Sequence, residues 1–133
     1  MKPANATLDT VLRAFERGDV NTLLQHIDDN IDFRIDHYRD DHDISWQRAA
    51  NKDEFLAMLQ RVASEVFPQG TKLLEVDTED LGGGWAMTKM RQHFYYGVQE
   101  RHVDSRTWII SHSQNGLCDY FRETVTTLQP LPR

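Results

Sequence analysis

The segment from residue 35 to residue 46, IDHYRDDHDISW, concentrates side chains that bind metals or transfer protons. Four aspartates and two histidines fall within eight of its positions. His37 and His42 carry imidazole nitrogens, which are common zinc ligands. Asp40 or Asp43 would add carboxylate oxygens, but the spacing matches no strong metal motif, and the glycine and glutamate of an EF-hand loop are absent. We therefore predict no metal site and interpret the segment as a solvated loop.

Length, charge and cysteine content limit the classes of protein to which the chain can belong. The 133 residues fit one domain, which we predict to span residues 1–133, with a core at about 6–127 and a proline-broken tail at 128–133. A net charge of −6 disfavours a nucleic-acid partner, because phosphates bind basic surfaces. The sequence shows no apolar run near the ~20 residues of a membrane span, no signal peptide and only one cysteine. We therefore expect a cytoplasmic protein with neither a nucleic-acid nor a membrane partner.

The elements that would position any site begin with helices. Apolar residues recur at helical spacing over residues 8–15 and again over residues 20–27. Gly18 suits the C-cap of the first run and Asp19 suits the N-cap of the second. A third amphipathic run predicts a helix at about residues 51–67.

The remaining segments alternate apolar and polar residues, which is typical of half-buried strands. The first strand is predicted at residues 31–36, between the second and third helices. Turns are expected at the glycine triplet 82–84 and at Asn115–Gly116. The further strands are predicted at about residues 71–80, 85–98, 106–113 and 117–128. This order indicates an α+β fold with the helices packed on one face of a curved antiparallel sheet.

Two segments carry a resemblance to a known superfamily. FERGDVNTLLQHIDDNIDFRID, near the N-terminus, and SQNGLCDYFRETV, near the C-terminus, resemble the opening and the ending of SnoaL-like proteins, also called nuclear transport factor 2-like. The resemblance implies a cone-shaped sheet with a pocket between its concave face and the helices, and dimers formed through the sheet. The superfamily includes ketosteroid isomerases, polyketide cyclases, dehydratases, epoxide hydrolases and non-catalytic binders, so the fold alone does not give the function.

Ketosteroid isomerases provide a residue-by-residue test of this resemblance. Counting from Gly18, their oxyanion-binding tyrosine would fall at Val11 and their general-base aspartate near Ile35. Counting back from Gly116, their proton-donating aspartate would fall at Trp108. None of these side chains supplies the hydroxyl or carboxyl group that the isomerisation needs. Asp36 is one position from Ile35, but a one-residue slip would turn over the whole strand. We therefore do not expect ketosteroid isomerase activity.

The resemblance also implies which strand faces line the cone. It places one face of the strand at 85–98 inward, together with the matching faces of the strands at 106–113 and 117–128. The ionisable groups on these faces are Glu123, His93, Arg91 and Arg106. The aromatic walls on this assignment are Trp108, Phe121 and Tyr95.

Glu123 is the candidate general base, because several SnoaL-like families carry a carboxylate at this distance after the turn glycine. Burial against aromatic residues would raise the pKa of Glu123, and Arg106 would lower it. His93 is the candidate proton-transfer partner, and Arg91 or Arg106 would stabilise developing negative charge. The alternatives are a structural ion pair between Glu123 and an arginine, an ordinary hydrogen-bonded His93, and aromatic residues that belong to the core or to a dimer contact.

The acidic segment gains a role from the same resemblance. In this superfamily the connection between the first strand and the third helix lies beside the pocket mouth. We therefore expect a lid or rim, with His37, Tyr38 and Trp46 as the residues nearest a ligand.

Three functions remain open on these predictions. The first is a cofactor-independent isomerase, dehydratase or cyclase that acts by acid–base chemistry on a small hydrophobic molecule. The second is a non-catalytic ligand-binding or accessory module, in which the ionisable groups of the pocket are all internally paired. The third is a structural homodimer whose cone is filled by its own side chains.

Overall fold

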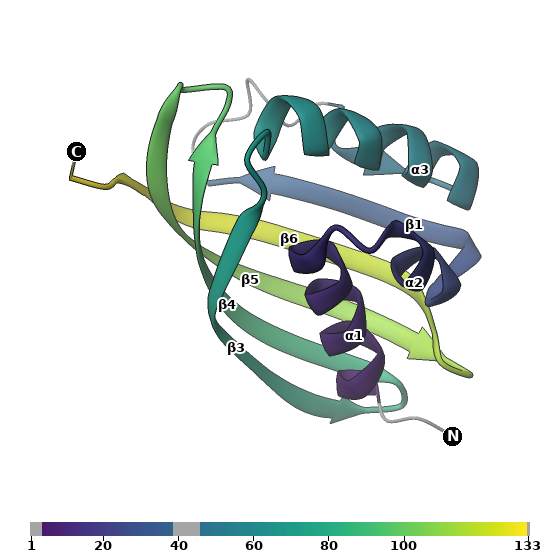
Figure 1. Ribbon diagram of the computed structural model, residues 1–133. Coiled ribbons are helices and arrows are strands. Elements are labelled where there is room, and N and C mark those ends of the chain that lie inside the picture. The colour runs from purple at the N-terminus through teal and green to yellow at the C-terminus, as the bar shows by residue number, and fades with distance from the viewer. Residues whose placement is uncertain (1–3, 39–45, 133) are drawn as a thin grey trace.

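The computed structural model of the chain describes residues 4–38 and 46–132, with side chains from residue 6 onward. Helices α1 (Ala4–Arg17), α2 (Val20–Gln25) and α3 (Lys52–Arg61) lie on one face of a curved sheet, and a π-helical turn, η1 (Val62–Val66), extends α3 (Figure 1). The strands, in chain order, are β1 (Ile27–His37), β2 (Arg48–Ala49), β3 (Thr71–Gly82), β4 (Trp85–Tyr96), β5 (Arg101–Gln114) and β6 (Leu117–Pro130). The α+β fold predicted from the sequence is confirmed.

The sheet has the order β2-β1-β6-β5-β4-β3 and is antiparallel at every pairing except one. Strand β1 runs parallel to β6, with Phe33 opposite Phe121 and Ile35 opposite Glu123. The intervening α3 and the β3–β4–β5 meander supply the long connection that parallel pairing requires. This pairing brings the first and last strands together, so that residues far apart in the sequence share one wall.

The predicted helix boundaries are confirmed where caps define them. The Asp19 carboxylate accepts a hydrogen bond from the Thr22 backbone N–H at 3.1 Å, which begins α2. The Asn51 side chain does the same for the Glu54 N–H at 2.8 Å, and Glu54 in turn accepts from the Ala50 N–H at 2.9 Å. These reciprocal bonds fix the start of α3 and the direction in which it crosses the sheet.

Several strands are longer than predicted. Strand β1 begins at Ile27, within the run predicted to be helical, because Ile27 pairs with Cys118 of β6. Strand β5 begins at Arg101, and β6 continues to Pro130 opposite Val103, into the segment predicted to be a tail. Pairing with a neighbouring strand therefore overrides the local polarity of these ends.

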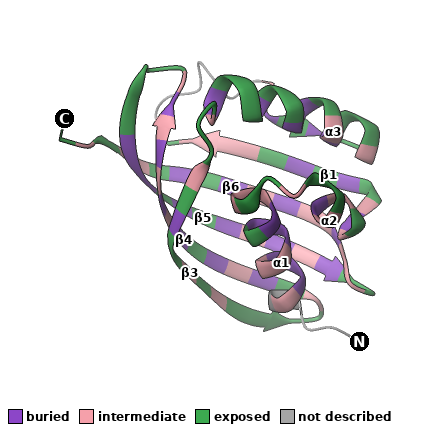
Figure 2. Ribbon diagram, in the orientation of Figure 1, coloured by how far each residue is buried: buried purple, intermediate pink, exposed green. Residues whose placement is uncertain are grey.

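The core lies between the concave face of the sheet and the helices, and burial alternates along the central strands (Figure 2). Leu8 and Leu12 of α1 and Phe55 and Leu59 of α3 pack toward Ile109 of β5 in one cluster. The inward face of β4 consists of Ala86, Thr88, Met90, Gln92, Phe94 and Tyr96.

The face predicted to line the cone is therefore wrong for β4 and β5. A bulge explains the error: the β5–β6 register shifts between His112 and Ser113, where Asp119 is the extra residue. Without it, the hairpin would place Trp108 opposite Glu123, as predicted. With it, Ile109 is the residue opposite Glu123, and Trp108 lies on the convex face.

None of the helices in the described part of the chain is long and apolar enough to cross a membrane. No group of three or more histidine, cysteine, aspartate or glutamate side chains that could hold a metal ion occurs within residues 4–38 and 46–132. Asp40, His42 and Asp43, which the metal interpretation considered, lie outside the described residues.

Candidate functional site

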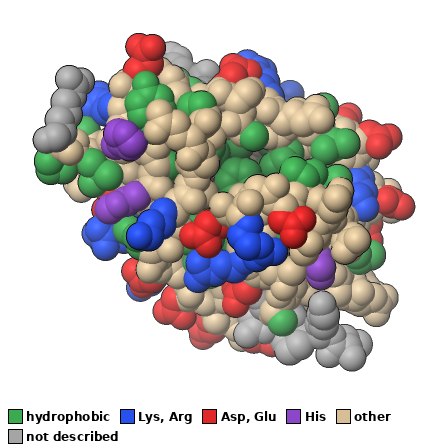
Figure 3. All heavy atoms as spheres, viewed as in Figure 1, with side chains coloured by type: hydrophobic (Ala, Val, Ile, Leu, Met, Phe, Trp, Pro, Cys, Tyr) green, Lys and Arg blue, Asp and Glu red, His purple; other side chains and the backbone are tan. Residues whose placement is uncertain are grey.

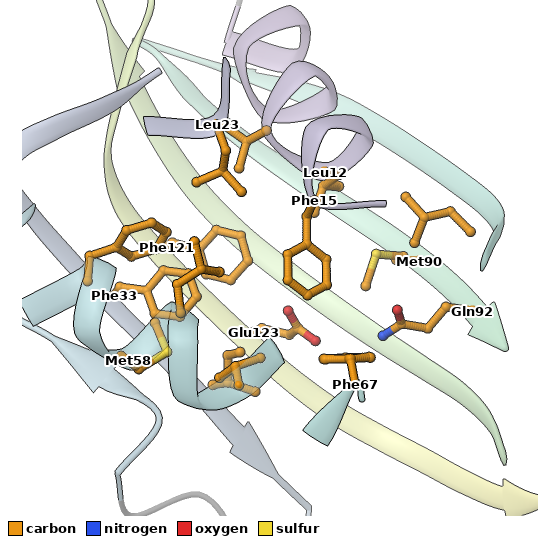
Figure 4. Close-up of a pocket in the computed structure, with 16 residues that line it drawn as sticks. Leu12, Phe15, Leu23, Phe33, Met58, Phe67, Met90, Gln92, Phe121 and Glu123 are labelled. Atoms are coloured by element: carbon orange, nitrogen blue, oxygen red, sulfur yellow. The ribbon is translucent and has the colours of Figure 1, made fainter. Parts of the chain in front are cut away.

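A mostly apolar cavity of about 80 Å³ lies between the helices and the concave sheet face. We call it the inner cavity. Its walls include Phe15 of α1, Met58 of α3 and Phe121 of β6 (Figure 4). Among the described residues that line it, the polar ones are Gln92 and Glu123. This composition, apolar with few polar groups, is typical of a small-molecule site.

Glu123 enters the inner cavity from β6, and its side chain has no partner within residues 4–38 and 46–132. The residue is 8% exposed, and it makes no hydrogen bond or ion pair with any residue of the described chain. Burial raises the pKa of Glu123 to about 7, because no residue of the described chain offsets the loss of water around the charged form. Near neutral pH this carboxyl group can therefore both release and accept a proton.

A second, smaller cavity of about 20 Å³ adjoins Glu123 on its other side, and we call it the polar cavity. Glu123 and Gln92 line both cavities. The further polar side chains around the polar cavity are His37, Gln47, Tyr96 and Ser105. The surface that lines this cavity is nonetheless mostly apolar, so it does not hydrate Glu123 well either.

A third space, the outer hollow, lies between α1–α2 and α3–η1 and measures about 270 Å³. Hydrophobic side chains gather in the recess between these helices (Figure 3). The hollow shares Phe15, Leu23, Leu59 and Phe67 with the inner cavity. The Phe15 and Phe67 rings meet edge to face, with centroids 5.2 Å apart, and form part of the partition between the two spaces.

The predicted partnership of Glu123 with His93 is wrong, because the two side chains lie on opposite faces of the sheet. On the convex face, the Arg91 guanidinium donates to Asp104 Oδ2 at 2.7 Å, and His93 Nε2 lies 3.1 Å from the same oxygen. Hydrogen bonding from Arg91 holds the pKa of Asp104 below its ordinary value. Arg91 and His93 therefore serve a convex-face ion cluster and do not reach the inner cavity.

The other residues predicted for the site divide between the two faces. Phe121 lines the inner cavity and stacks on Phe33, with ring centroids 4.5 Å apart. Trp108 is 43% exposed on the convex face, where Arg106 lies opposite Arg91 and Tyr95 contacts His102. The predictions that Arg106, Trp108 and Tyr95 line the cone are therefore wrong, because the bulge at Asp119 turns these side chains to the convex face. The predicted alternative of an ion pair between Glu123 and Arg91 or Arg106 is also not found among the described residues.

The three positions counted from ketosteroid isomerases are also divided between the inner cavity and the convex face. Val11 and Ile35 do line the inner cavity, but both are aliphatic. Trp108 lies outside it. The structure thus gives no oxyanion site of that kind at these positions.

The residues predicted to form the rim have three different environments. His37 lines the polar cavity, with its ring 6.4 Å from that of Tyr96. Tyr38 is 61% exposed, and its backbone N–H donates to the Val125 carbonyl at 2.8 Å. Trp46 lies under the Arg61 guanidinium, 4.0 Å from the ring centroid. Of the three, His37 is the residue beside the candidate site.

The polar residue that the sequence prediction missed is Gln92. It lies between Met90 and Phe94 on the inward face of β4. The feature of the sequence that could have indicated it is one amide side chain on a mostly apolar strand face. Such a buried amide requires a hydrogen-bonding reason.

No protein-family model matches the chain, and no curated protein matches its sequence. Solved structures match it closely in fold. A protein provisionally named an isomerase, from Rhodopseudomonas palustris, is 19% identical with a TM-score of 0.68, over 94% of this chain and 90% of that one. A protein provisionally named a polyketide cyclase, from Pseudomonas putida, is 13% identical with a TM-score of 0.75, over 92% and 91%.

A nuclear transport factor 2-like protein of unknown function, from Burkholderia pseudomallei, is 16% identical with a TM-score of 0.73, over 92% of this chain and 90% of its own. Identities this low establish the fold and leave the activity open. The predicted SnoaL-like, or nuclear transport factor 2-like, fold is confirmed.

Proposed function

We propose that the protein binds a small, largely apolar molecule in the inner cavity and transfers protons on it through Glu123, without a cofactor. The reaction class is that of an isomerase, dehydratase or cyclase. Structural neighbours provisionally named an isomerase and a polyketide cyclase have the same fold, which is consistent with this class but does not select within it.

The observation that carries the proposal is the unpaired carboxyl group in an apolar cavity. A carboxylate that is stripped of water and lacks a counter-ion is a stronger base than one in solution, and its pKa near 7 matches the pH at which it would work. The ionised Glu123 would take a proton from a carbon or hydroxyl group of the ligand. The resulting acid would return that proton to another atom of the same ligand or to a leaving hydroxide, which leaves Glu123 ready for the next cycle.

The dimensions of the cavity limit the ligand. A closed apolar cavity of roughly 150 Å³ holds benzene, so the 80 Å³ of the inner cavity holds a smaller group unless its wall moves. Displacement of Phe15 or Phe67 would join it to the 270 Å³ outer hollow. We therefore propose that the reacting end of the ligand lies beside Glu123 and that any larger part extends into the outer hollow.

The main alternative is a non-catalytic binding or accessory module. That alternative predicted internally paired ionisable groups, whereas Glu123 has no partner in the described chain. The structural-homodimer alternative predicted a cone filled by its own side chains, whereas the inner cavity and the outer hollow are open space. The lack of a partner for Glu123 favours the enzyme over the binding module, and the open space favours either ligand-binding function over the structural dimer.

The test is turnover of a panel of small unsaturated ketones and hydroxyketones, followed by proton NMR in D₂O. We expect isomerisation, water loss or deuterium incorporation, at a rate that rises with pH to a plateau above about 7 as Glu123 ionises. Glu123→Gln should lower the rate at least about a hundredfold, because an amide cannot accept the proton. Glu79→Gln, an exposed carboxylate on β3, is the control and should not change it.

Equal rates in wild type and Glu123→Gln would contradict the proposal. So would ketones that bind without exchange or conversion at any pH, and that second result would favour the binding module.

We also propose that the convex face of the sheet forms a homodimer contact. This face presents the exposed indoles of Trp85 and Trp108, and large exposed aromatic groups are enriched at protein interfaces. We expect the wild type to sediment as a dimer and Trp108→Asp to sediment as a monomer. A wild type that stays monomeric at the highest concentration tested would contradict the contact.

A further inference from the structure

The inner cavity contains one polar group besides Glu123, and nothing in the proposed proton transfer uses it. Gln92 is 4% exposed, and its side chain enters the cavity from β4. Figure 4 shows the Gln92 amide and the Glu123 carboxyl group pointing toward one another from their two strands. A buried amide with no function would cost stability, because its donors have left water.

Thr71 determines which end of the Gln92 amide faces the cavity. The Thr71 hydroxyl donates to Gln92 Oε1 at 2.7 Å, a far better distance than the 3.4 Å to the His93 carbonyl. With its oxygen occupied on the side of β3, Gln92 directs its NH₂ group into the cavity. That group donates to no residue of the described chain. Its two hydrogens are therefore available to a ligand.

We infer that Gln92 is a substrate-positioning residue that donates a hydrogen bond to a carbonyl oxygen, and that the ligands of this site are small apolar carbonyl compounds. The inference rests on the proposed function and makes it more specific. An acceptor on the ligand is required, since the NH₂ group can only donate. Held by Gln92 on one side, the carbonyl compound would place its neighbouring C–H bonds toward Glu123, the group proposed to remove a proton.

A carbonyl group is favoured over the other acceptors for a physical reason. A carboxylate ligand would bring a second negative charge next to Glu123, and the described lining of the inner cavity contains no cation to offset it. A hydroxyl ligand could accept from Gln92, but its own proton would then go to Glu123 and occupy the base. A ketone, aldehyde or ester satisfies the amide and leaves Glu123 free to act on a neighbouring C–H bond.

The test compares two probes of the same shape, cyclopentanone and methylenecyclopentane, which differ in having C=O or C=CH₂. Both are about as large as benzene, so their binding requires the wall movement at Phe15 or Phe67 proposed above. Affinities are measured by ¹H–¹⁵N NMR titration of the full chain at pH 5 and pH 8.5, with the Gln92 side-chain NH₂ signals observed directly. Because the ketone loses more hydration than the alkene on leaving water, the readout is the affinity ratio of cyclopentanone to methylenecyclopentane in each protein. We expect this ratio to be about fivefold higher in the wild type than in Gln92→Leu at both pH values, as one neutral hydrogen bond would give. Cyclopentanone, but not methylenecyclopentane, should shift the Gln92 NH₂ signals downfield.

The variants separate positioning from folding. Gln92→Leu should lose this fivefold advantage of cyclopentanone, and Gln129→Leu, a change at an exposed glutamine on β6, should keep it. Thr71→Val should weaken the preference and broaden the Gln92 NH₂ signals, because the amide loses the bond that orients it.

Each contrary result has its own meaning. Equal affinity ratios in the wild type and in Gln92→Leu would overturn the inference about Gln92 while leaving the cavity and Glu123 as proposed. A preference that persists in Gln92→Leu and disappears at pH 8.5 would identify protonated Glu123 as the donor and would also overturn it. If neither probe binds the wild type, the inference and the proposed small-molecule site both fail.

Discussion

Glu123→Gln is expected to be more stable than the wild type by about 3 kcal/mol at pH 8.5 and similar to it at pH 4.5. In the folded protein, burial raises the pKa of Glu123 from 4.5 to about 7. Between these values the unfolded chain releases its proton while the folded chain keeps it. The free energy of unfolding of the wild type therefore falls as the pH rises through this window and stays lower above it. Glutamine cannot ionise, so the variant lacks this loss.

The measurement is urea denaturation of both proteins at several pH values from 4.5 to 8.5. Asp104, whose pKa is lowered, acts with the opposite sign, and its contribution is lost as the pH falls through its folded pKa. It is present in both proteins and cancels in their difference. Glu79→Gln is the matched control, since it removes an exposed carboxylate. Parallel stability curves for wild type and Glu123→Gln would show that Glu123 is hydrated or paired in solution.

Phe121→Ala is expected to lower the free energy of unfolding by about 3–5 kcal/mol, whereas Trp108→Ala should lower it by less than about 1 kcal/mol. Phe121 is 4% exposed and stacks on Phe33, so its removal leaves a void in the wall of the inner cavity. Trp108 lies on the convex face and loses few contacts in one chain. Chemical denaturation at two protein concentrations measures both effects.

The pair also tests which face of the sheet is concave. If the convex face forms a dimer, the Trp108→Ala effect should grow with protein concentration, while the Phe121→Ala effect should not. The face assignment would be contradicted if Trp108→Ala lowered the free energy of unfolding more than Phe121→Ala did, and by the same amount at both protein concentrations.

The order of the elements was predictable because helical periodicity and cap residues are local signals. Asp19 and Asn51 begin helices in the structure as their residue types indicate. The extra length of β1 and β5 was not predictable in this way. It depends on hydrogen bonds to β6, which no local pattern encodes.

Only part of the candidate site was predictable, and one bulge accounts for the difference. The sequence indicated Glu123 and Phe121, which lie on the same strand beyond the bulge and keep their relative alternation. It placed Trp108 beside them by counting along the strands to the resembling superfamily. That count took the alternation to be uninterrupted, and a β-bulge has no reliable sequence signature. That single shift exchanged His93 and Arg91 for Gln92 as the residues facing the cavity.

The most direct test of the central claim is the pKa of Glu123 in the folded wild type, measured by ¹³C NMR titration of its side-chain carboxyl carbon. The signal is assigned by its absence from Glu123→Gln. An unpaired carboxyl group beside an apolar cavity predicts a midpoint near pH 7. A midpoint near the ordinary 4.5 would contradict the account, since Glu123 would then be hydrated or compensated, with no exceptional basicity to use in proton transfer.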